Sequence, residues 1–389
     1  ERTLGIPLFQ EQLIRMAMTA AGFSGGQADE LRRAMGFKRS HERMNVIEKD
    51  LRAGMTKKGI TGAAQEEIVQ GIKSFALYGF PESHAASFAL IAYASAYLKA
   101  HHPAAFLCAL LNNYPLGFYH PSTLVSDAVR HGVSVRAIDV TRSGWLADLE
   151  DGGRAVRLGL RSVSGLREEL GRKIEEARRL APFASLVDFA HRSGAEGDAG
   201  ALSRLAEIGA LAELGGERRA ALWQVEALGR SGQLFSKTRS APLEESPLPE
   251  MSAEEELAAD YAGTNLTIGQ HPVAFARAAL DRQGVTRAAD LGRVPGGRRA
   301  RVAGVVIVRQ RPGTAKGFVF ITVEDETGFA NAIVTPDRFE QHRQIILGAS
   351  ALMIEGVVQN QDGVVSIKAD RFERLGGGAG AIDVSHDFH

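Results

Sequence analysis

The stretch from Ala76 to Asn113 reads ALYGFPESHAASFALIAYASAYLKAHHPAAFLCALLNN, and the first part of the chain is organised around it. Gly79 and Pro81 predict a turn, because glycine allows unusual backbone angles and proline fixes φ at a helix start. From Ala85 to Lys99 almost every residue is apolar or small, with the larger side chains at helical spacing. This pattern predicts a helix that is buried on most sides, followed by a second apolar helix from Ala104 to Leu111.

Two polar residues, Ser83 and His84, stand at the start of the first of these helices. The first backbone N–H groups of a helix have no partner within it, so this position suits an anion or the edge of a sugar–phosphate. A simple helix cap at Ser83 and a histidine covering the edge of a core would explain the same residues. From the residues alone this second interpretation is favoured, because caps are common and anion sites are few.

A basic cluster surrounds the end of a predicted helix that begins near Gln27, with Leu31 and Met35 facing inward. The cluster consists of Arg32, Arg33, Lys38 and Arg39. Nine Lys or Arg oppose five Asp or Glu between Asp29 and Lys58, whereas Pro242 to Asp260 holds seven acids and no base. Only the first region could attract phosphate, although a solvated basic face would look similar and charge counting alone favours it.

The chain has 389 residues, a formal net charge of zero and a single cysteine, Cys108. This length allows roughly two to four domains. A disulfide within the chain is excluded, and a reducing cytoplasm is the expected location. The zero net charge argues against a uniformly basic nucleic-acid binder, and no apolar run is long enough for a membrane span.

Two segments have the pattern of a helix-hairpin-helix, in which a glycine turn aims backbone N–H groups at a DNA phosphate. The first runs from Leu160 to Leu166 and precedes a predicted helix from Arg167 to Leu180; a more degenerate copy follows about 45 residues later. The turn residues that would face DNA are Ser164, Gly165, Leu166 and Gly209. Each copy alone is a weak signal, and a helix–turn–helix core that touches no DNA would explain it at least as well.

From Arg299 onward the sequence changes to five alternating, strand-like runs. They are 300–310, 317–324, 329–335, 349–359 and 363–371, with a helix-like segment, 336–346, between the third and fourth. This order is what a small OB barrel needs. Basic side chains beside aromatic ones could follow and stack single-stranded DNA, although alternating phenylalanines also fill barrel cores. The basic residues are Arg309, Arg311 and Lys316, and the phenylalanines are Phe318, Phe320 and Phe329.

The run YGFPESHAASFALIAYASAYLKAHHPAAFLCALL, together with LFQEQLIRMA and ADELRRAMGFKR before it, resembles the fingers of bacterial family C DNA polymerases. These include the DNA polymerase III alpha subunit and its error-prone paralogue, and the similarity covers nearly the whole chain. Asp139 to Ser143 is similar to the family's D-x-N-x-S turn, with Thr141 where Asn is usual. The ending SHDFH, Ser385 to His389, and a chain that stops just past its barrel resemble the error-prone branch.

The resemblance implies a multidomain α+β protein, with mostly α-helical fingers and a tandem helix-hairpin-helix region followed by a C-terminal all-β OB-fold barrel. The expected domains are the C-terminal part of the fingers at 1–114, the tandem hairpins at 115–228, an acidic linker with connecting helices at 229–298, the OB fold at 299–375 and a flexible tail at 376–389. Without a cover, the apolar stretch from Ala85 to Leu111 would expose a large apolar surface.

The same resemblance assigns roles to the polar residues of the fingers. The basic cluster would neutralise the triphosphate of an incoming nucleotide, since arginine supplies the planar, paired donors that phosphate oxygens require. His84 would lie against the nucleotide sugar and Ser83 beside the phosphates. The tandem hairpins would grip duplex DNA electrostatically, so that salt weakens the binding.

Two-metal nucleotidyl transfer needs carboxylates that hold two Mg²⁺ ions about 4 Å apart, and the sequence has no suitable Asp-x-Asp within a strand. In the family these carboxylates lie in a palm before the fingers. The chain is therefore expected to be the C-terminal portion of a translesion polymerase, inactive alone and without a catalytic or metal-binding residue. Its expected partners are primed template DNA, dNTPs and a sliding clamp with other mutasome proteins. The alternative is a palm-less accessory protein that binds primed or single-stranded DNA.

Overall fold

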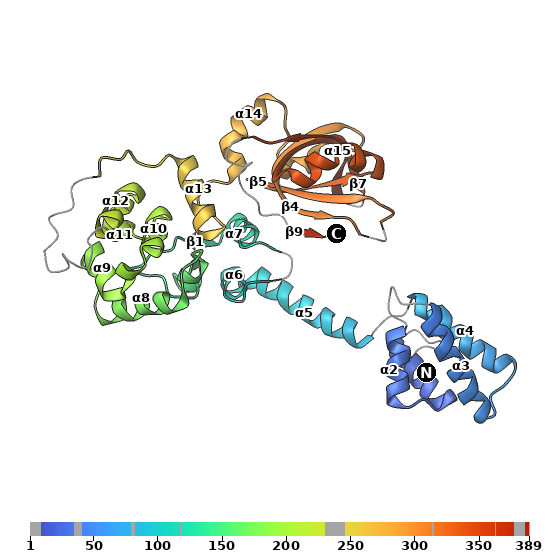
Figure 1. Cartoon of the computed structure of the whole chain (residues 1–389). Helices are drawn as coiled ribbons and strands as arrows, with labels where there is room; N and C mark the ends of the chain where they lie inside the picture. The colour runs from blue at the N-terminus through green and yellow to red at the C-terminus, as the bar shows by residue number, and fades with distance from the viewer. Residues whose placement is uncertain are drawn as a thin grey trace. The chain divides into compact units, whose positions relative to one another are not determined.

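The computed structural model describes residues 9–34, 41–78, 82–116, 119–229, 246–312, 315–361, 363–376 and 386–388. The chain divides into two compact units, Glu1–Leu98 and Lys99–His389. The first is helical, and the second contains further helices and a β-barrel (Figure 1). Separate hydrophobic cores lie in the first unit, in the helical part of the second, and in the barrel.

Short helices pack around a small core in the first unit. They are α1 (Gln10–Met16), the π-helix η1 (Ala17–Ala21), α2 (Gly25–Ala34), α3 (His41–Lys57) and α4 (Ala63–Tyr78). The α1–η1 helix ends at Gly22, whose φ of 72° is the left-handed value common at helix ends. Leu13, Leu31 and Met55 are fully buried between the helices. The predicted inward position of Leu31 is confirmed, whereas Met35 lies outside the described residues.

Helix α5 (Glu82–His101) forms where the sequence predicts it, but its apolar side chains are not buried. Phe88 is 67% exposed, Ile91 59% and Tyr93 75%. The prediction of a helix buried on most sides is therefore wrong for the described chain. Apolar residues surround the whole helix instead of forming one stripe, so burial needs neighbours on most sides, and the described segments leave these side chains accessible. The expected exposed apolar surface is present.

The second unit begins with a helical region built around a three-stranded sheet of order β1-β3-β2. Its strands are β1 (Ser134–Arg136), β2 (Asp148–Glu150) and β3 (Ala155–Arg157). The helices are α6 (Pro103–Asn112), α7 (Pro121–Arg130), α8 (Glu168–Leu180), α9 (Leu186–Ser193), α10 (Ala199–Glu207), α11 (Ala212–Gly215) and α12 (Arg218–Gly229). The predicted helices 104–111 and 167–180 are confirmed.

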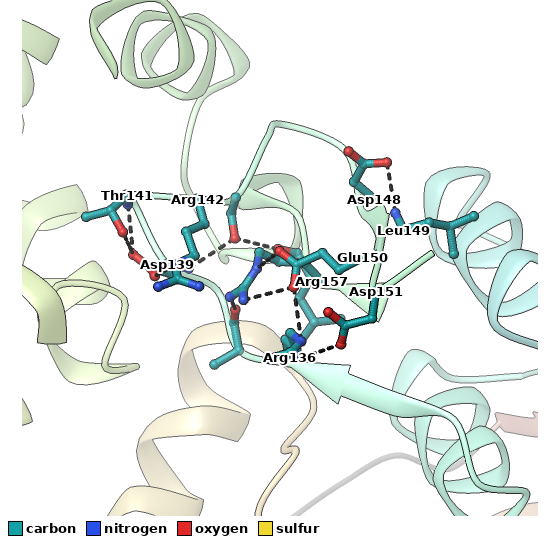
Figure 2. Close-up of polar contacts among 12 residues, drawn as sticks. Arg136, Asp139, Thr141, Arg142, Asp148, Leu149, Glu150, Asp151 and Arg157 are labelled. Carbon is teal, nitrogen blue, oxygen red and sulfur yellow. Dashed lines mark hydrogen bonds and ion pairs between the residues drawn. The ribbon is translucent and has the colours of Figure 1, made fainter. Parts of the chain in front are cut away.

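Ion pairs and an Asx turn fix this small sheet and the chain beside it (Figure 2). Buried Arg157 donates to both carboxylate oxygens of Glu150, at 2.5 and 3.1 Å, and the Nε of Arg136 lies 3.0 Å from Glu150. The Oδ1 of Asp139 accepts hydrogen bonds from the N–H and the hydroxyl of Thr141, at 2.8 and 2.7 Å. Thr141 therefore completes the turn at the position where the resembling motif has Asn.

A connecting segment leads from the helical region to the barrel. It contains α13 (Ala253–Thr264), η5 (Pro272–Ala276), α14 (Arg277–Arg282) and η6 (Ala288–Arg293). Ser252 and Glu255 form a capping box at the start of α13, with bonds of 3.3 and 2.8 Å.

The C-terminal part closes into a barrel. Its strands are β4 (Arg299–Gln310), β5 (Val319–Asp325), β6 (Gly328–Val334), β7 (Ala351–Gln361) and β8 (Val364–Arg374), with α15 (Pro336–Gly348) between β6 and β7. Closure is possible because β4 is long: its first half pairs with β7 and its second half with β5. Alternate side chains such as Val302, Ile321 and Ile367 fill the interior. The predicted OB-fold barrel, with its helix between the third and fourth strands, is confirmed.

The predicted flexible tail contains a strand. β9 (His386–Phe388) pairs in parallel with residues 308–310 of β4. A short paired strand therefore lies within the segment expected to be a flexible tail. The reason is a barrel strand that still offers backbone N–H and C=O groups along one edge, which is a template for another strand.

Candidate nucleic-acid interface

The first predicted hairpin turn forms and is open. A short 3₁₀ helix, η2 (Leu160–Ser162), leads to Gly165, whose φ is 79°, and α8 follows with Arg167 as its N-cap. No side chain caps α8, and a Cβ added at Gly165 would meet no atom within 4 Å. Leu166 is only 8% exposed and anchors the turn in the core. Gly165 therefore stands beside open space next to the start of α8, as a phosphate contact requires.

Two arginines flank this turn, and their side chains differ in how firmly the protein holds them. Arg161 is held in place, since it donates to the carbonyl oxygens of Asn112 and Tyr114 at 2.6 and 2.7 Å. The side chain of Arg167 is 70% exposed and lies 3.1 Å from Asp198. An exposed ion pair of this kind is weak, so Arg167 can exchange Asp198 for a phosphate. Arg167 was not among the predicted site residues, although a basic residue directly after a glycine turn and before a helix is a usable signal.

The second predicted turn also forms, but protein covers it. Gly209 has a φ of 77°, and its N–H donates to Ala206 at 3.0 Å. A Cβ added at Gly209 would lie 3.1 Å from the Nε of Arg218, which itself pairs with Asp260 at 2.7 Å. Gly209 therefore faces the side chain of Arg218 and not open space.

The end of α13 joins the two hairpins. The N–H of Ser164 donates to the carbonyl of Gly263 at 2.7 Å, so this amide is used within the protein. On its other side, Gly263 packs on Ile208, and a Cβ at Gly263 would lie 2.2 Å from the Cγ2 of Ile208. Only a glycine allows this approach, which fixes both hairpins to one helix end.

Replacing Gly263 by alanine should therefore destabilise the protein. The added methyl overlaps Ile208, which is 6% exposed and cannot move away freely, so we expect a loss of about 1–3 kcal/mol in the free energy of unfolding. Denaturant unfolding of the two proteins measures it. Gly200→Ala in α10 is the matched control, because a Cβ there approaches only Asp198, at 3.8 Å, and alanine favours helix. Equal stability of the Gly263→Ala variant and the wild type would disprove the close packing.

The three basic residues predicted at the first barrel hairpin have different environments. Arg309 is 6% exposed, and its guanidinium donates to the carbonyls of Ile346, at 2.6 Å, and Ala349. It binds the end of α15, so we do not keep it as a DNA contact. Arg311 has a 44% exposed side chain and lies 4.7 Å from the ring centroid of Phe339. Lys316 is exposed. The register shift between Val306 and Val308 places Arg309 opposite Ile321, on the inner face of the barrel, whereas Arg311 and Lys316 beyond the strand are exposed.

Two phenylalanines lie on the outer face of the barrel. Phe320 is 37% exposed while its neighbour Ile321 is buried, and Phe329 is 40% exposed and pairs in register with Glu324. Phe320 and Glu324 are four residues apart on β5, which corresponds to about 13 Å. Phe318 is half-buried in the hairpin. Of the two interpretations that the sequence left open, an outward position is therefore correct for Phe320 and Phe329.

Ion pairs join the barrel to the helical region. The Nη1 of Arg130, the last residue of α7, lies 2.6 Å from the Oε1 of Glu324, and its guanidinium lies 4.7 Å from the ring centroid of Phe329. Nearby, Arg277 contacts Asp325 at 3.1 Å and Glu326 at 2.5 Å. No motif in the sequence indicates these contacts, because Arg130 and Glu324 are 194 residues apart.

Burial dominates the titration of Glu324. The residue is 3% exposed, and burial raises the pKa of its carboxyl to about 7, although the hydrogen bond from Arg130 acts in the opposite direction. Burial also lowers the pKa of His271 at this junction to about 4. Near neutral pH, Glu324 is therefore partly protonated and His271 is neutral.

The stability of the protein should depend on pH through Glu324. The pKa of Glu324 in the folded protein is above the ordinary 4.5. The stabilising contribution of protonated Glu324 to the free energy of unfolding is therefore fully present below about pH 4.5 and is lost as the pH rises through about 7. The free energy of unfolding, measured from about pH 5 to about pH 8, should fall in the wild type relative to Glu324→Gln by up to about 3 kcal/mol. A difference between the two proteins that stays constant over this range would refute the raised pKa.

The residues predicted to contact nucleotide lie in the first unit. Arg32 and Arg33 both bind Asp29, at 2.8 and 2.7 Å, and their side chains are 47% and 63% exposed. The hydrogen bond from Arg32 holds the pKa of Asp29 below its usual value. Asp29 thus neutralises one of the two positive charges. Lys38 and Arg39 lie outside the described residues. Ser83 and His84 belong to the first turn of α5, and their side chains also lie outside the described part.

Three family models match separate parts of the chain. The bacterial DNA polymerase III alpha subunit finger domain matches residues 1–59, a helix-hairpin-helix motif matches 132–221, and an OB-fold nucleic acid binding domain matches 300–375. The last two ranges contain the two glycine turns and the closed barrel.

Curated relatives match the whole chain. The error-prone DNA polymerase of Anaeromyxobacter dehalogenans (strain 2CP-C) is 48% identical over 401 residues, and that of Azoarcus sp. (strain BH72) is 47% identical over 400, each covering 100% of this chain. Along its whole length the chain is a homologue of the error-prone DNA polymerases. It spans 35% of the first relative and 37% of the second, about a third of their length.

One solved structure that matches is asparaginyl-tRNA synthetase from Pyrococcus horikoshii complexed with asparaginyl-adenylate. The matched region is 23% of this chain and 22% of the synthetase chain. The TM-score is 0.20 and the identity 21%, too low to support an argument. Within the described ranges of this polymerase homologue, no three His, Cys, Asp or Glu side chains are placed to hold a metal ion. None of the described helices is both long and apolar enough to cross a bilayer.

Proposed function

We propose that this chain is the C-terminal portion of an error-prone DNA-directed DNA polymerase that acts in translesion synthesis after DNA damage. In it, the chain supplies nucleotide-binding fingers and two DNA-binding modules. The observation that carries the proposal is the alignment of all 389 residues with error-prone polymerases at 48% identity. The matched finger, hairpin and barrel models, in that order, support it.

In this proposal the fingers bind the incoming dNTP. Arg32, Arg33, Lys38 and Arg39 face its triphosphate, Ser83 lies beside the phosphates and His84 lies against the sugar. The pair with Asp29 does not prevent this role, because exposed ion pairs are weak and a triphosphate carries more charge than one carboxylate. Arg33, the more exposed of the two described arginines, is the better first test.

Two modules hold primed template DNA. The open turn at Ser164, Gly165 and Leu166, with the start of α8 and Arg167, contacts a phosphate of the duplex. Arg311 and Lys316 bind the backbone of a single strand, whose bases stack on Phe320. The barrel is a suitable support because the core residues on the inner face of β5 hold Phe320 outward.

The chemical step needs groups outside this chain. Two Mg²⁺ ions stabilise the attacking and leaving oxygens in nucleotidyl transfer, and carboxylates must hold them. In this proposal Mg²⁺ is held by the carboxylates of a palm in the full-length polymerase. A sliding clamp and other mutasome proteins are its further proposed partners, and the cytoplasm is its proposed location.

Primer extension tests the enzymatic proposal. We expect no nucleotide addition by this chain alone with Mg²⁺, dNTPs and primed template, and addition once the chain is extended by the sequence encoded upstream of Glu1. In the active protein, Arg33→Ala should lower kcat/KM for dNTP about tenfold, the value of a charged hydrogen bond, whereas Lys49→Ala, another exposed cation of the same unit, should not. A stop codon directly upstream would instead favour the palm-less accessory protein. The two DNA-binding modules of the chain are compatible with that alternative.

Salt dependence tests the duplex contact under either proposal. Removing one phosphate contact with Arg167→Ala should weaken binding to duplex DNA of any sequence and reduce the slope of log K against log salt by about 1. Arg293→Ala is the control, since that side chain is 84% exposed and lies outside the hairpins. An unchanged slope in Arg167→Ala would remove the first hairpin from the DNA surface.

A further inference from the structure

One end of the outer barrel face is occupied by the protein itself. Phe329 has the exposure of a stacking platform, yet the guanidinium of Arg130 lies 4.7 Å from its ring centroid. The same guanidinium lies 2.6 Å from Glu324, the residue that pairs with Phe329 across the strands. At the other end of β5, Phe320 is half-exposed, and the cation–ring contacts of the described residues involve Phe183, Phe329 and Phe339 instead.

We propose that Arg130 is a gate on the single-strand path, and that a DNA strand running along the whole face displaces Arg130 from Phe329. The proposal rests on the single-strand function proposed above for the barrel and names a competitor for it within the chain. A base and a guanidinium cannot both stack on the same ring face, so the two states exclude each other.

The closed contact carries costs that favour release. The Nη2 of Arg130 is buried without a hydrogen-bond partner in the described structure, and an unsatisfied buried donor is unfavourable. The carboxylate of Glu324 is almost fully removed from water, which offsets part of the attraction between the two charges. Both costs fall when the side chain of Arg130 swings away and water reaches the two groups.

Space for this movement lies next to the gate. A cavity of about 310 Å³ is bordered by Val129 and Arg130 of α7 and by Ile268, His271 and Glu326 of the connecting segment and the barrel. Its volume exceeds that of an arginine side chain, so Arg130 can leave Phe329 without unfolding α7. The carboxylate of Glu326 at its wall is an alternative partner, now bound by Arg277 at 2.5 Å.

The direction of the change in DNA affinity when Arg130 is removed distinguishes this gate from a DNA contact. If Arg130 bound phosphate, its removal would weaken binding to DNA, since one positive charge is lost. If Arg130 covers Phe329, its removal should strengthen binding to a single strand, because one more base can stack. A stacked base contributes enough for a gain of about fivefold or more.

The test measures the affinity of the whole chain for oligodeoxythymidylate of increasing length at fixed salt. The variants are Arg130→Ala and the double variant Arg130→Ala with Glu324→Gln. The double variant removes the carboxylate of Glu324 that the single change would leave buried and unpaired, and so guards against misfolding. Arg142→Ala is the charge control, since its side chain is 57% exposed and belongs to the same helical region. We expect tighter binding for both Arg130 variants, with the gain confined to the longer oligonucleotides, and no gain for the control.

Adding Phe329→Ala to the Arg130 variants should abolish the gain. Weaker or unchanged binding in both Arg130 variants, while the wild type binds single strands through Phe320, would overturn the gate and leave the proposed barrel function standing. No binding by any of the proteins would overturn both. A wild type that does not bind, beside an Arg130 variant that does, would support the gate as an inhibitory contact.

Discussion

The approach of Gly263 to Ile208 is the constraint on which the helical region of the second unit depends. With no side chain at Gly263, the end of α13 lies close enough for its carbonyl to accept the Ser164 amide at 2.7 Å. The first hairpin is thereby held by a backbone bond and the second by van der Waals packing. The same connecting segment continues to Arg277, whose pairs with Asp325 and Glu326 fix the barrel. One segment therefore sets the positions of both DNA modules within this unit.

This arrangement makes the two hairpins unequal. At the first turn the end of α13 binds the amide and the hydroxyl of Ser164 and leaves Gly165 beside open space, whereas Arg218 covers the turn at Gly209. The acidic composition of the connecting segment then has a structural reason. Asp260 pairs with Arg218 at 2.7 Å and Glu255 with Arg219 at 2.7 Å, so these acids neutralise the basic side of the second hairpin instead of repelling DNA.

Local sequence patterns predicted the elements well, and contacts distant in sequence explain what they missed. The barrel strands were predictable because alternation along β5 and β6 is set by one buried face. The role of Arg309 was not, because its partners, Ile346 and Ala349, belong to another element, and a basic residue at a hairpin looks the same whether it binds carbonyls or phosphate. The exposure of α5 was not predictable either. Apolar residues on all sides of a helix indicate that it is buried, but they do not show which segment covers it.

The Arg130 contact also bounds how strongly the two modules can influence each other. A single strand that displaces Arg130 can shift the junction only by the difference in its affinity for the open and covered faces. That difference is about one stacked base, which is small against the Arg277 pairs and the packing of α13. Displacement should therefore free a side chain without separating the barrel from the hairpins, and the duplex and single-strand modules keep a fixed spacing while the length of the single-strand site changes.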